Sequence, residues 1–229
     1  MTRSLTHSVG ITATGQFYPE RIVTNKDIAA MVDTTDEWIT TRTGIHQRRW
    51  VEPGVGSSDL GAAALKMALA NRGVGADTLD AIVACTVTPD MMFPCTAALI
   101  QDKVGASKAY GFDLNAACSS FLFGLSTAAA MVASGAVQRV AVVGCDVMTS
   151  IMNPQDRNTV VLFGDGAGAV DFTPSDLISS FQPVPAKLDT SSLTTRDPPF
   201  RFLSLYTVTS ALLTIIDDIP SPPTSTELL

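Results

Sequence analysis

Three short apolar runs, separated by two helical stretches, constrain the fold of this chain more than any other feature of its sequence. The runs cover residues 81–86, 110–114 and 139–144, and the helical stretches cover residues 94–104 and 118–134. Nearly continuous apolar strands are typical of sheets whose two faces are both covered by helices. Two consecutive βαβ units therefore predict an α/β fold with a mostly parallel sheet and right-handed crossovers.

Caps and periodicity predict further elements on either side of this βαβαβ segment. Thr34 and Glu37 are three residues apart, the spacing of a capping box, and indicate the start of a short helix. The helices predicted before the segment begin at Thr24, at Thr34 and at Ser57, and the last of them ends near Gly73. The additional strands are predicted over residues 9–15, 159–163 and 167–172.

Composition divides the chain into two segments. All 16 glycines lie between Gly10 and Gly168, whereas the last 59 residues hold 8 of the 13 prolines, 9 serines and 9 threonines. We expect a folded segment over residues 1–172. Residues 173–229 are expected to form a divergent Ser/Thr/Pro-rich tail, either disordered or the product of a frameshift.

Charge and hydropathy exclude several classes of function. The formal net charge is −7, and neither segment has the excess of lysine and arginine that nucleic-acid binding requires. The sequence contains no apolar stretch of signal-peptide or membrane-span length, so a cytoplasmic protein without membrane contact is expected. Its four cysteines form no CxxC pair and are expected to be free thiols, and no metal site is predicted.

Cys118 is the strongest candidate for a reactive residue. It follows the predicted strand 110–114 and begins a predicted helix, so it lies at the carboxyl end of a parallel strand, where ligands bind in open α/β sheets. The positive end of the helix dipole favours a thiolate there. The alternative is a buried cysteine that acts as a small apolar residue, which is the preferred interpretation of Cys85, Cys95 and Cys145.

Trp38 and Arg42 are four residues apart and share one face of the predicted short helix. An indole there can stack on a flat ring while a guanidinium holds a phosphate. An exposed cation–π pair is the alternative interpretation, and the spacing alone does not decide between them.

Two further features are interpreted as structural. The run from Gly164 to Gly168 lacks the spacing of a dinucleotide-binding loop and predicts a tight turn between two strands. His46 lies in a basic loop and is predicted to be a surface residue.

Several separated motifs together resemble β-ketoacyl-ACP synthase III, the enzyme that starts type II fatty acid biosynthesis. They are TTDEWITTRTGI from Thr34, NAACSSF from Asn115, Asp156-Arg157 and FGDGAGA from Phe163. The resemblance is collinear from about residue 9 to residue 170. It implies the thiolase-like fold, which packs two similar βαβαβ halves together, with this chain supplying the N-terminal half.

The resemblance also implies a reaction. In that family the cysteine matching Cys118 takes an acetyl group from acetyl-CoA, and the acyl-enzyme then condenses with malonyl-ACP as carbon dioxide leaves. Acetyl-CoA is thus a substrate, acyl carrier protein is a partner, and no tightly bound cofactor is expected.

The binding residues are carried over in the same way. Trp38 and Arg157 match residues that sandwich the CoA adenine, and Thr34 and Arg42 match others that line the CoA site. Phe93 matches a residue that reaches into the acyl pocket of a partner subunit, which implies a homodimer.

The chain departs from the family pattern in one large respect. The family's catalytic histidine and asparagine lie in motifs resembling His-Gln-Ala-Asn and Gly-Asn-Thr-Ser, and neither motif occurs here. No histidine follows His46. We therefore expect a chain that is incomplete for condensation. A related condensing enzyme of polyketide or quinolone metabolism and an inactive half-domain or interaction module are the alternatives.

Overall fold

The computed structural model describes residues 8–174. The strands are β1 (Val9–Phe17), β2 (Ile22–Thr24), β3 (Gln47–Arg49), β4 (Ala81–Cys85), β5 (Tyr110–Leu114), β6 (Val140–Val147) and β7 (Asp165–Pro174). The α-helices are α1 (Asn25–Ala29), α2 (Asp36–Thr43), α3 (Ser57–Arg72), α4 (Thr96–Val104), α5 (Ser120–Ala133) and α6 (Arg157–Val160). Three short 3₁₀ turns are η1 (Ala76–Thr78), η2 (Ala117–Ser119) and η3 (Met148–Ser150).

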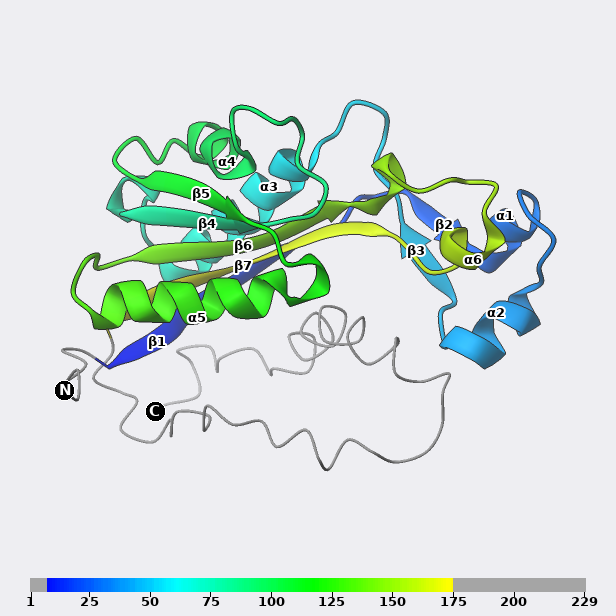
Figure 1. Ribbon diagram of the computed structural model, residues 1–229, viewed down its shortest axis with the longest axis horizontal. Helices are drawn as coiled ribbons and strands as arrows, with labels where there is room; N and C mark the ends of the chain where they lie inside the picture. The colour runs from blue at the N-terminus through cyan, green and yellow to red at the C-terminus, as the bar shows by residue number, and fades with distance from the viewer. Residues whose placement is uncertain (1–7, 175–229) are drawn as a thin grey trace, which may run out of the picture. The chain divides into compact units, whose positions relative to one another are not determined.

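Five strands form the main sheet, in the order β1-β7-β6-β4-β5. β4 pairs in parallel with β5 on one side and with β6 on the other, which confirms the predicted βαβαβ unit. β7 then returns antiparallel beside β6, and β1 pairs antiparallel with β7. The sheet is therefore mixed, with a parallel half that carries the crossover helices (Figure 1).

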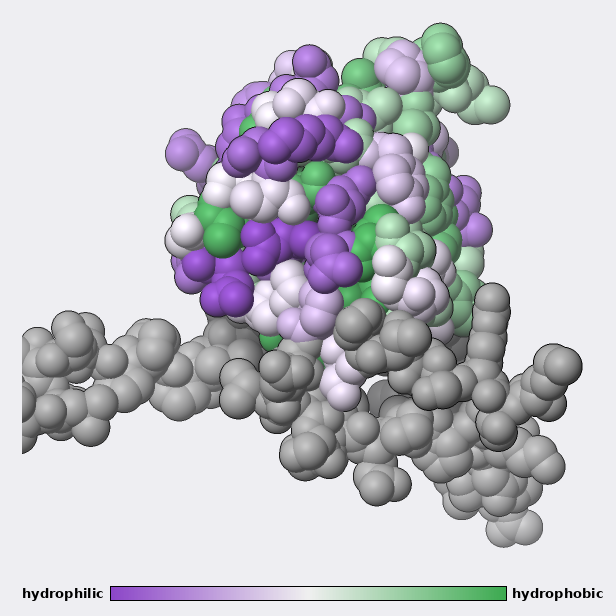
Figure 2. All heavy atoms as spheres, turned by 90° about the vertical axis from the view of Figure 1, so that its left-hand side faces the viewer, coloured by the Kyte–Doolittle hydropathy of each residue, from purple (hydrophilic) through white to green (hydrophobic). Residues whose placement is uncertain are grey.

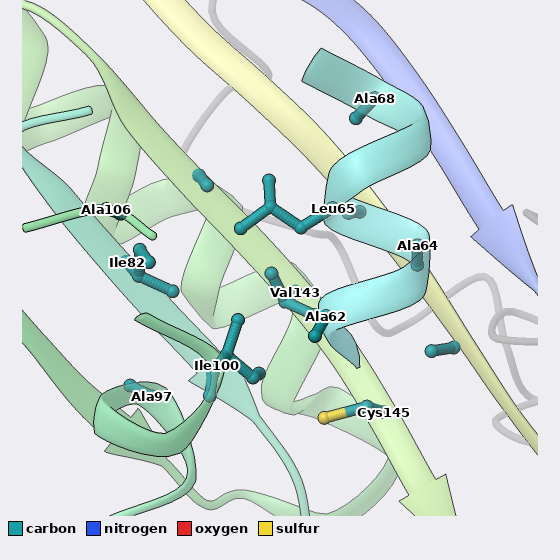
Figure 3. Packing of buried hydrophobic residues seen from close by; sticks show 14 of the residues in the cluster. Ala62, Ala64, Leu65, Ala68, Ile82, Ala97, Ile100, Ala106, Val143 and Cys145 are labelled. Carbon is teal, nitrogen blue, oxygen red and sulfur yellow. The ribbon is translucent and has the colours of Figure 1, made fainter. Parts of the chain in front are cut away.

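Helices cover both faces of the sheet because its central strands are apolar on both faces. In β4, Ile82 and Ala84 point to the core under α3 and α4, whereas Ala81 and Val83 point to the core under α5. Figure 3 shows the first of these cores, in which side chains of α3, α4, β4 and β6 converge. This two-sided burial is the reason that the runs of β4 and β6 are apolar on both faces.

A smaller lobe is built from β2, β3, α1, α2 and α6, which gather beyond one end of the main sheet (Figure 1). β2 and β3 pair antiparallel as a separate two-stranded sheet. The buried core of the lobe contains Val23, Ile28, Ile39, Trp50, Val160 and Val161. Segments from both ends of the described chain thus meet in this lobe.

Two predictions about the region around residue 160 are wrong. The strand predicted over residues 159–163 is replaced by α6, because Asp156 caps a helical turn by accepting hydrogen bonds from the Asn158 backbone N–H at 3.0 Å and from the Thr159 hydroxyl at 2.8 Å. The turn predicted between Gly164 and Gly168 lies instead largely within β7, because β1 and β6 both pair along this segment.

The helix starts are predicted with mixed success. Thr24 caps α1, as expected, and it also forms a capping box with Asp27, which was not predicted. α2 is capped by Thr35, whose hydroxyl accepts from the Trp38 backbone N–H, so the predicted cap at Thr34 is one residue early. The helix predicted from residue 118 begins at Ser120, because the three preceding residues form the 3₁₀ turn η2.

The outer face of α5 is apolar and exposed. The helix has 14 residues and no charged side chain, and Leu122 and Phe123 are 44% and 55% exposed. Figure 2 shows hydrophobic residues gathered along the right-hand side of the described part, which is the side that faces the viewer in Figure 1, where α5 lies in front of the sheet. A helix that is apolar all round is normally buried, so this face has the character of an internal interface.

The predicted tail lies outside the described residues from position 175 onward. None of the helices between residues 8 and 174 combines the length and the apolar character that a membrane span requires.

Replacing Gly124 by alanine is expected to lower the free energy of unfolding by about 1–3 kcal/mol, because the close contact of α5 with the sheet leaves no space for a methyl group. A Cβ at this position would lie 2.5 Å from the Cys85 Sγ and 2.9 Å from the Val142 Cγ1. Urea unfolding measures the change. In an open helix the same substitution stabilises by roughly 0.5–1 kcal/mol, so a gain in stability would contradict this packing. Ser126→Ala, on the exposed face of α5, is the control and should change stability by less than about 0.5 kcal/mol.

Candidate active site

Cys118 lies in the 3₁₀ turn η2, between the carboxyl end of β5 and the start of α5. The thiol is free and half-buried. The parallel strands β4, β5 and β6 all end on the side of the sheet that faces the smaller lobe (Figure 1). This is the position at which open α/β sheets bind their ligands.

The turn that holds Cys118 is tightly constrained. Ser120 accepts a hydrogen bond from the Ala116 backbone N–H at 2.7 Å and donates one to the Ala117 carbonyl at 2.6 Å. The Asn115 side-chain oxygen accepts from the Ala117 N–H at 3.2 Å. Ala117 has φ of +49°, and it is the one non-glycine residue between positions 8 and 174 with a positive φ. Such backbone strain clusters at functional sites, where it fixes the geometry of a neighbouring group.

Two of the other cysteines are unsuited to nucleophilic chemistry. Burial, with the charges of Asp146 and Asp113 adding to it, raises the pKa of the Cys85 thiol to about 12. Burial likewise raises the pKa of Cys145 well above its usual value. A thiol that keeps its proton is a poor nucleophile, so the structural interpretation of both residues agrees with their surroundings. Cys95 precedes α4, and its Sγ is 3.9 Å from the Gly111 carbonyl.

Two guanidinium groups, those of Arg42 and Arg157, pack against the ring of Trp38, and these three side chains form the Trp38 cluster. The Arg42 Cζ is 4.5 Å from the ring centroid, and the Arg157 Cζ is 4.2 Å from it. Trp38 and Arg42 come from α2 and Arg157 begins α6, so the lobe brings together residues more than a hundred positions apart in the chain. The predicted pairing of Trp38 with Arg42 is present, and both of its interpretations, a ligand platform and a cation–π pair, are compatible with this geometry.

Two polar atoms beside this cluster are unsatisfied. The Thr34 hydroxyl and the Arg157 Nε are buried and have no hydrogen-bond partner among the described residues. Buried polar groups normally find partners, and an orphaned one calls for an explanation such as a missing ligand. Both residues belong to the set that the family resemblance assigned to the CoA site.

A buried arginine that the sequence did not single out fixes the position of the cluster. Arg48 is 6% exposed and donates from Nη2 to the Asn25 side-chain oxygen at 3.0 Å and to the Val161 carbonyl, just after α6, at 2.8 Å. The Asn25 amide in turn donates to the Asp36 carboxylate, at the start of α2, at 2.7 Å. Desolvation lowers the pKa of Arg48. This network ties α2 to α6.

The two remaining residues of interest are at the surface. Phe93, in the loop after β4, is 87% exposed. His46 is also exposed, as predicted. Within the described residues, neither Phe93 nor His46 is among the side chains that pack around Trp38.

The architecture and the cysteine turn define the class of the protein: a thiolase-like α/β fold with a candidate nucleophile at the end of a parallel strand. Residues 112–183 match the family model of 3-oxoacyl-(acyl-carrier-protein) synthase III. The β-ketoacyl-ACP synthases III of Koribacter versatilis and Roseiflexus castenholzii are 50% and 52% identical over 166 residues, which are 72% of this chain and 50% of each relative.

Solved structures agree with these matches. The 3-oxoacyl-ACP synthase III of Aquifex aeolicus superposes with a TM-score of 0.72 at 41% identity, covering 74% of this chain and 55% of that one. The priming β-ketosynthase of the R1128 polyketide pathway gives a TM-score of 0.74 at 39% identity, covering 77% and 53%. These matches confirm the resemblance of the matched part to β-ketoacyl-ACP synthase III, and the chain spans about half the length of the curated relatives it matches.

In the folded protein, iodoacetamide is expected to alkylate Cys118 well before Cys85 and Cys145. With a pKa of about 12, only about one Cys85 thiol in ten thousand is ionised at pH 8, and burial blocks access as well. Peptide mass spectrometry of a time course at pH 8 measures the order of modification. All four cysteines should react in urea, which serves as the control. Labelling of Cys85 as fast as Cys118 in the folded chain would contradict the assignment.

Proposed function

We propose that Cys118 accepts an acyl group from a CoA thioester, with acetyl-CoA as the expected donor, as the first step of a β-ketoacyl-ACP synthase III reaction. The observation that carries this proposal is the constrained turn, which places a free thiol beside a strained Ala117 at the carboxyl end of β5. The similarity of the matched region to this family supports the same reaction.

The proposed step is a thiol exchange. The Cys118 thiolate attacks the thioester carbonyl carbon and forms a C–S bond, and the bond to the CoA sulfur then breaks. CoA leaves as a thiolate and takes up a proton, so the acyl group is transferred without oxidation or reduction. The backbone N–H groups of the turn around Cys118 are candidates for stabilising the oxyanion that develops on the carbonyl.

The Trp38 cluster is the proposed binding site for the CoA nucleotide. An adenine ring can insert between the indole of Trp38 and the guanidinium of Arg157, whose Cζ is 4.2 Å from the ring centroid, if the two groups separate to admit it. Arg42, at the end of α2, offers a cation to the phosphates, and the unsatisfied Thr34 hydroxyl offers a donor.

The second half of the proposed reaction is condensation with malonyl-ACP, which initiates type II fatty acid biosynthesis in the family. It requires stabilisation of the enolate that forms as carbon dioxide leaves, and the 229 residues contain neither the His-Gln-Ala-Asn nor the Gly-Asn-Thr-Ser motif. Two absent oxyanion donors, at about 3 kcal/mol each, slow such a step on the order of 10⁴-fold. We therefore propose that these residues support acyl transfer far better than condensation.

The proposed partners follow from the same comparison. Acyl carrier protein delivers the malonyl group, and a second copy of the chain contacts the exposed Phe93, as the family resemblance implies. The second candidate function is priming of a polyketide synthase, which the similarity to the R1128 ketosynthase favours. Comparing acetyl-CoA with longer acyl-CoA donors distinguishes the two.

Mixing the chain with excess acetyl-CoA is expected to release about one CoA per chain, because each Cys118 is acylated once. A thiol reagent that follows free CoA in a stopped-flow instrument measures this burst. Cys118→Ala should abolish it, and Cys95→Ala, which removes the other half-buried thiol, should leave it unchanged. An undiminished burst from Cys118→Ala would rule out this cysteine as the acceptor.

Arg157→Ala is expected to raise the acetyl-CoA concentration for half-maximal acylation by about tenfold, while the maximal rate changes less than about twofold. The substitution removes a stacking partner of the nucleotide but nothing near the thiol. The concentration dependence of the CoA burst gives both quantities. Arg72→Ala, at the far end of α3, is the matched control, and an equal effect from both variants would refute a specific site at Trp38.

A further inference from the structure

The loop between β4 and α4 presents a cluster of large apolar side chains to solvent. Met91 is 48% exposed, Met92 is 96% exposed and Phe93 is 87% exposed. Met92 and Phe93 are the two most exposed large apolar side chains between residues 8 and 174. Adjacent exposed apolar residues of this size mark an interaction site rather than ordinary surface.

The beginning of this loop is held by a single carboxylate from the neighbouring strand. Asp146, near the end of β6, accepts four hydrogen bonds at Oδ1. Two come from the Thr86 hydroxyl at 2.9 Å and the Val87 backbone N–H at 2.9 Å. The other two come from Thr88, whose backbone N–H lies at 3.2 Å and whose hydroxyl lies at 2.8 Å. One half-buried carboxylate oxygen thus fixes three consecutive residues of the loop.

The middle and the end of the loop are also held by carboxylates. Asp90 accepts from the Ser58 backbone N–H at 2.9 Å and from the Ser58 hydroxyl. Asp113, on β5, accepts from the Thr96 and Ala97 N–H groups, both at 2.8 Å, and thereby fixes the start of α4. The apolar segment lies between these anchors, so the structure holds it in place although its side chains touch little of the protein.

Preorganisation of this kind strengthens association, because a loop that is already ordered loses less conformational entropy when it meets its partner. We propose that Asp146 is a positioning residue, which holds residues 86–93 so that Met92 and Phe93 face a second copy of this chain. The identity of the partner rests on the homodimer of the proposed function. The role of Asp146 in ordering the loop rests on its own hydrogen bonds.

The test compares Asp146→Ala with Asp165→Ala in the full chain. Asp165 is the control, because its carboxylate likewise accepts several hydrogen bonds, from the Val51 N–H, the Thr149 N–H and the Thr149 hydroxyl, far from the loop in sequence. Sedimentation equilibrium measures the dimer dissociation constant, and hydrogen exchange measures the protection of residues 91–93, whose N–H groups do not bond to Asp146.

Asp146→Ala is expected to weaken the dimer by about tenfold and to speed exchange at residues 91–93, whereas Asp165→Ala changes neither. Asp146→Asn keeps an acceptor at the Oδ1 position and should stay within about threefold of the unmodified chain. If Asp146→Ala does not fold, hydrogen exchange at residues 91–93 is compared in Asp146→Asn and in Thr86→Val, which removes one of the four donors. Faster exchange in Thr86→Val then supports the positioning role of Asp146.

Unchanged exchange in the folded variants, or equal weakening by Asp146→Ala and Asp165→Ala, would overturn the positioning role. A monomeric unmodified chain at high concentration would instead overturn the proposed homodimer, and with it the partner assigned to this loop. The exchange data separate these two failures, because they report on loop order in a monomer as well as in a dimer.

Discussion

The parallel pairing of β4 with both β5 and β6 is the constraint on which the rest of the structure depends. It brings the carboxyl ends of three strands to one end of the sheet, and a segment with a candidate functional residue follows each of these ends. β4 is followed by the loop that carries Phe93, β5 by the Cys118 turn, and β6 by the segment that leads to Arg157. A parallel sheet gathers such segments without requiring them to be close in sequence.

The smaller lobe depends on a different interaction, the buried guanidinium of Arg48. It donates hydrogen bonds to the neutral oxygens of Val23, Asn25 and Val161. A buried cation of this kind costs desolvation energy, which its hydrogen bonds offset. Because Arg48 is hydrogen-bonded to Val161, just after α6, its charge also adds positive potential near a site proposed to bind a nucleotide with phosphate groups.

Much of the main sheet could be predicted from the sequence, because the chain's apolar runs are bounded by glycine and polar residues. The limits of β5 and the end of α3 at Gly73 are as expected. The errors lie where long-range pairing overrides local pattern. The glycines at 164–168 suggest a turn, yet pairing with β1 and β6 draws most of this run into β7. The residues 159–163 look like a strand, yet the Asp156 cap begins a helix there.

The residues of the candidate site also fall into two groups, those that the sequence indicates and those that only the structure reveals. Cys118 could be proposed from its place after an apolar strand, and Trp38 with Arg42 from helical spacing. Arg48 and Asp146 could not, because their hydrogen bonds join segments that are up to 113 residues apart for Arg48 and about 60 residues apart for Asp146. A buried charged residue in a loop or strand gives no local sign of the network that it organises. The one local signal is a charged residue, Asp146, near the end of the otherwise apolar strand β6.

The account is tested most directly by locating the acyl group after the chain has been incubated with acetyl-CoA alone. Tandem mass spectrometry of the digested protein should find the acetyl group on the peptide that contains Cys118, and the modification should disappear in Cys118→Ala. A chain that stays unmodified while a full-length relative is acetylated under the same conditions would contradict the account. So would acetylation confined to other residues.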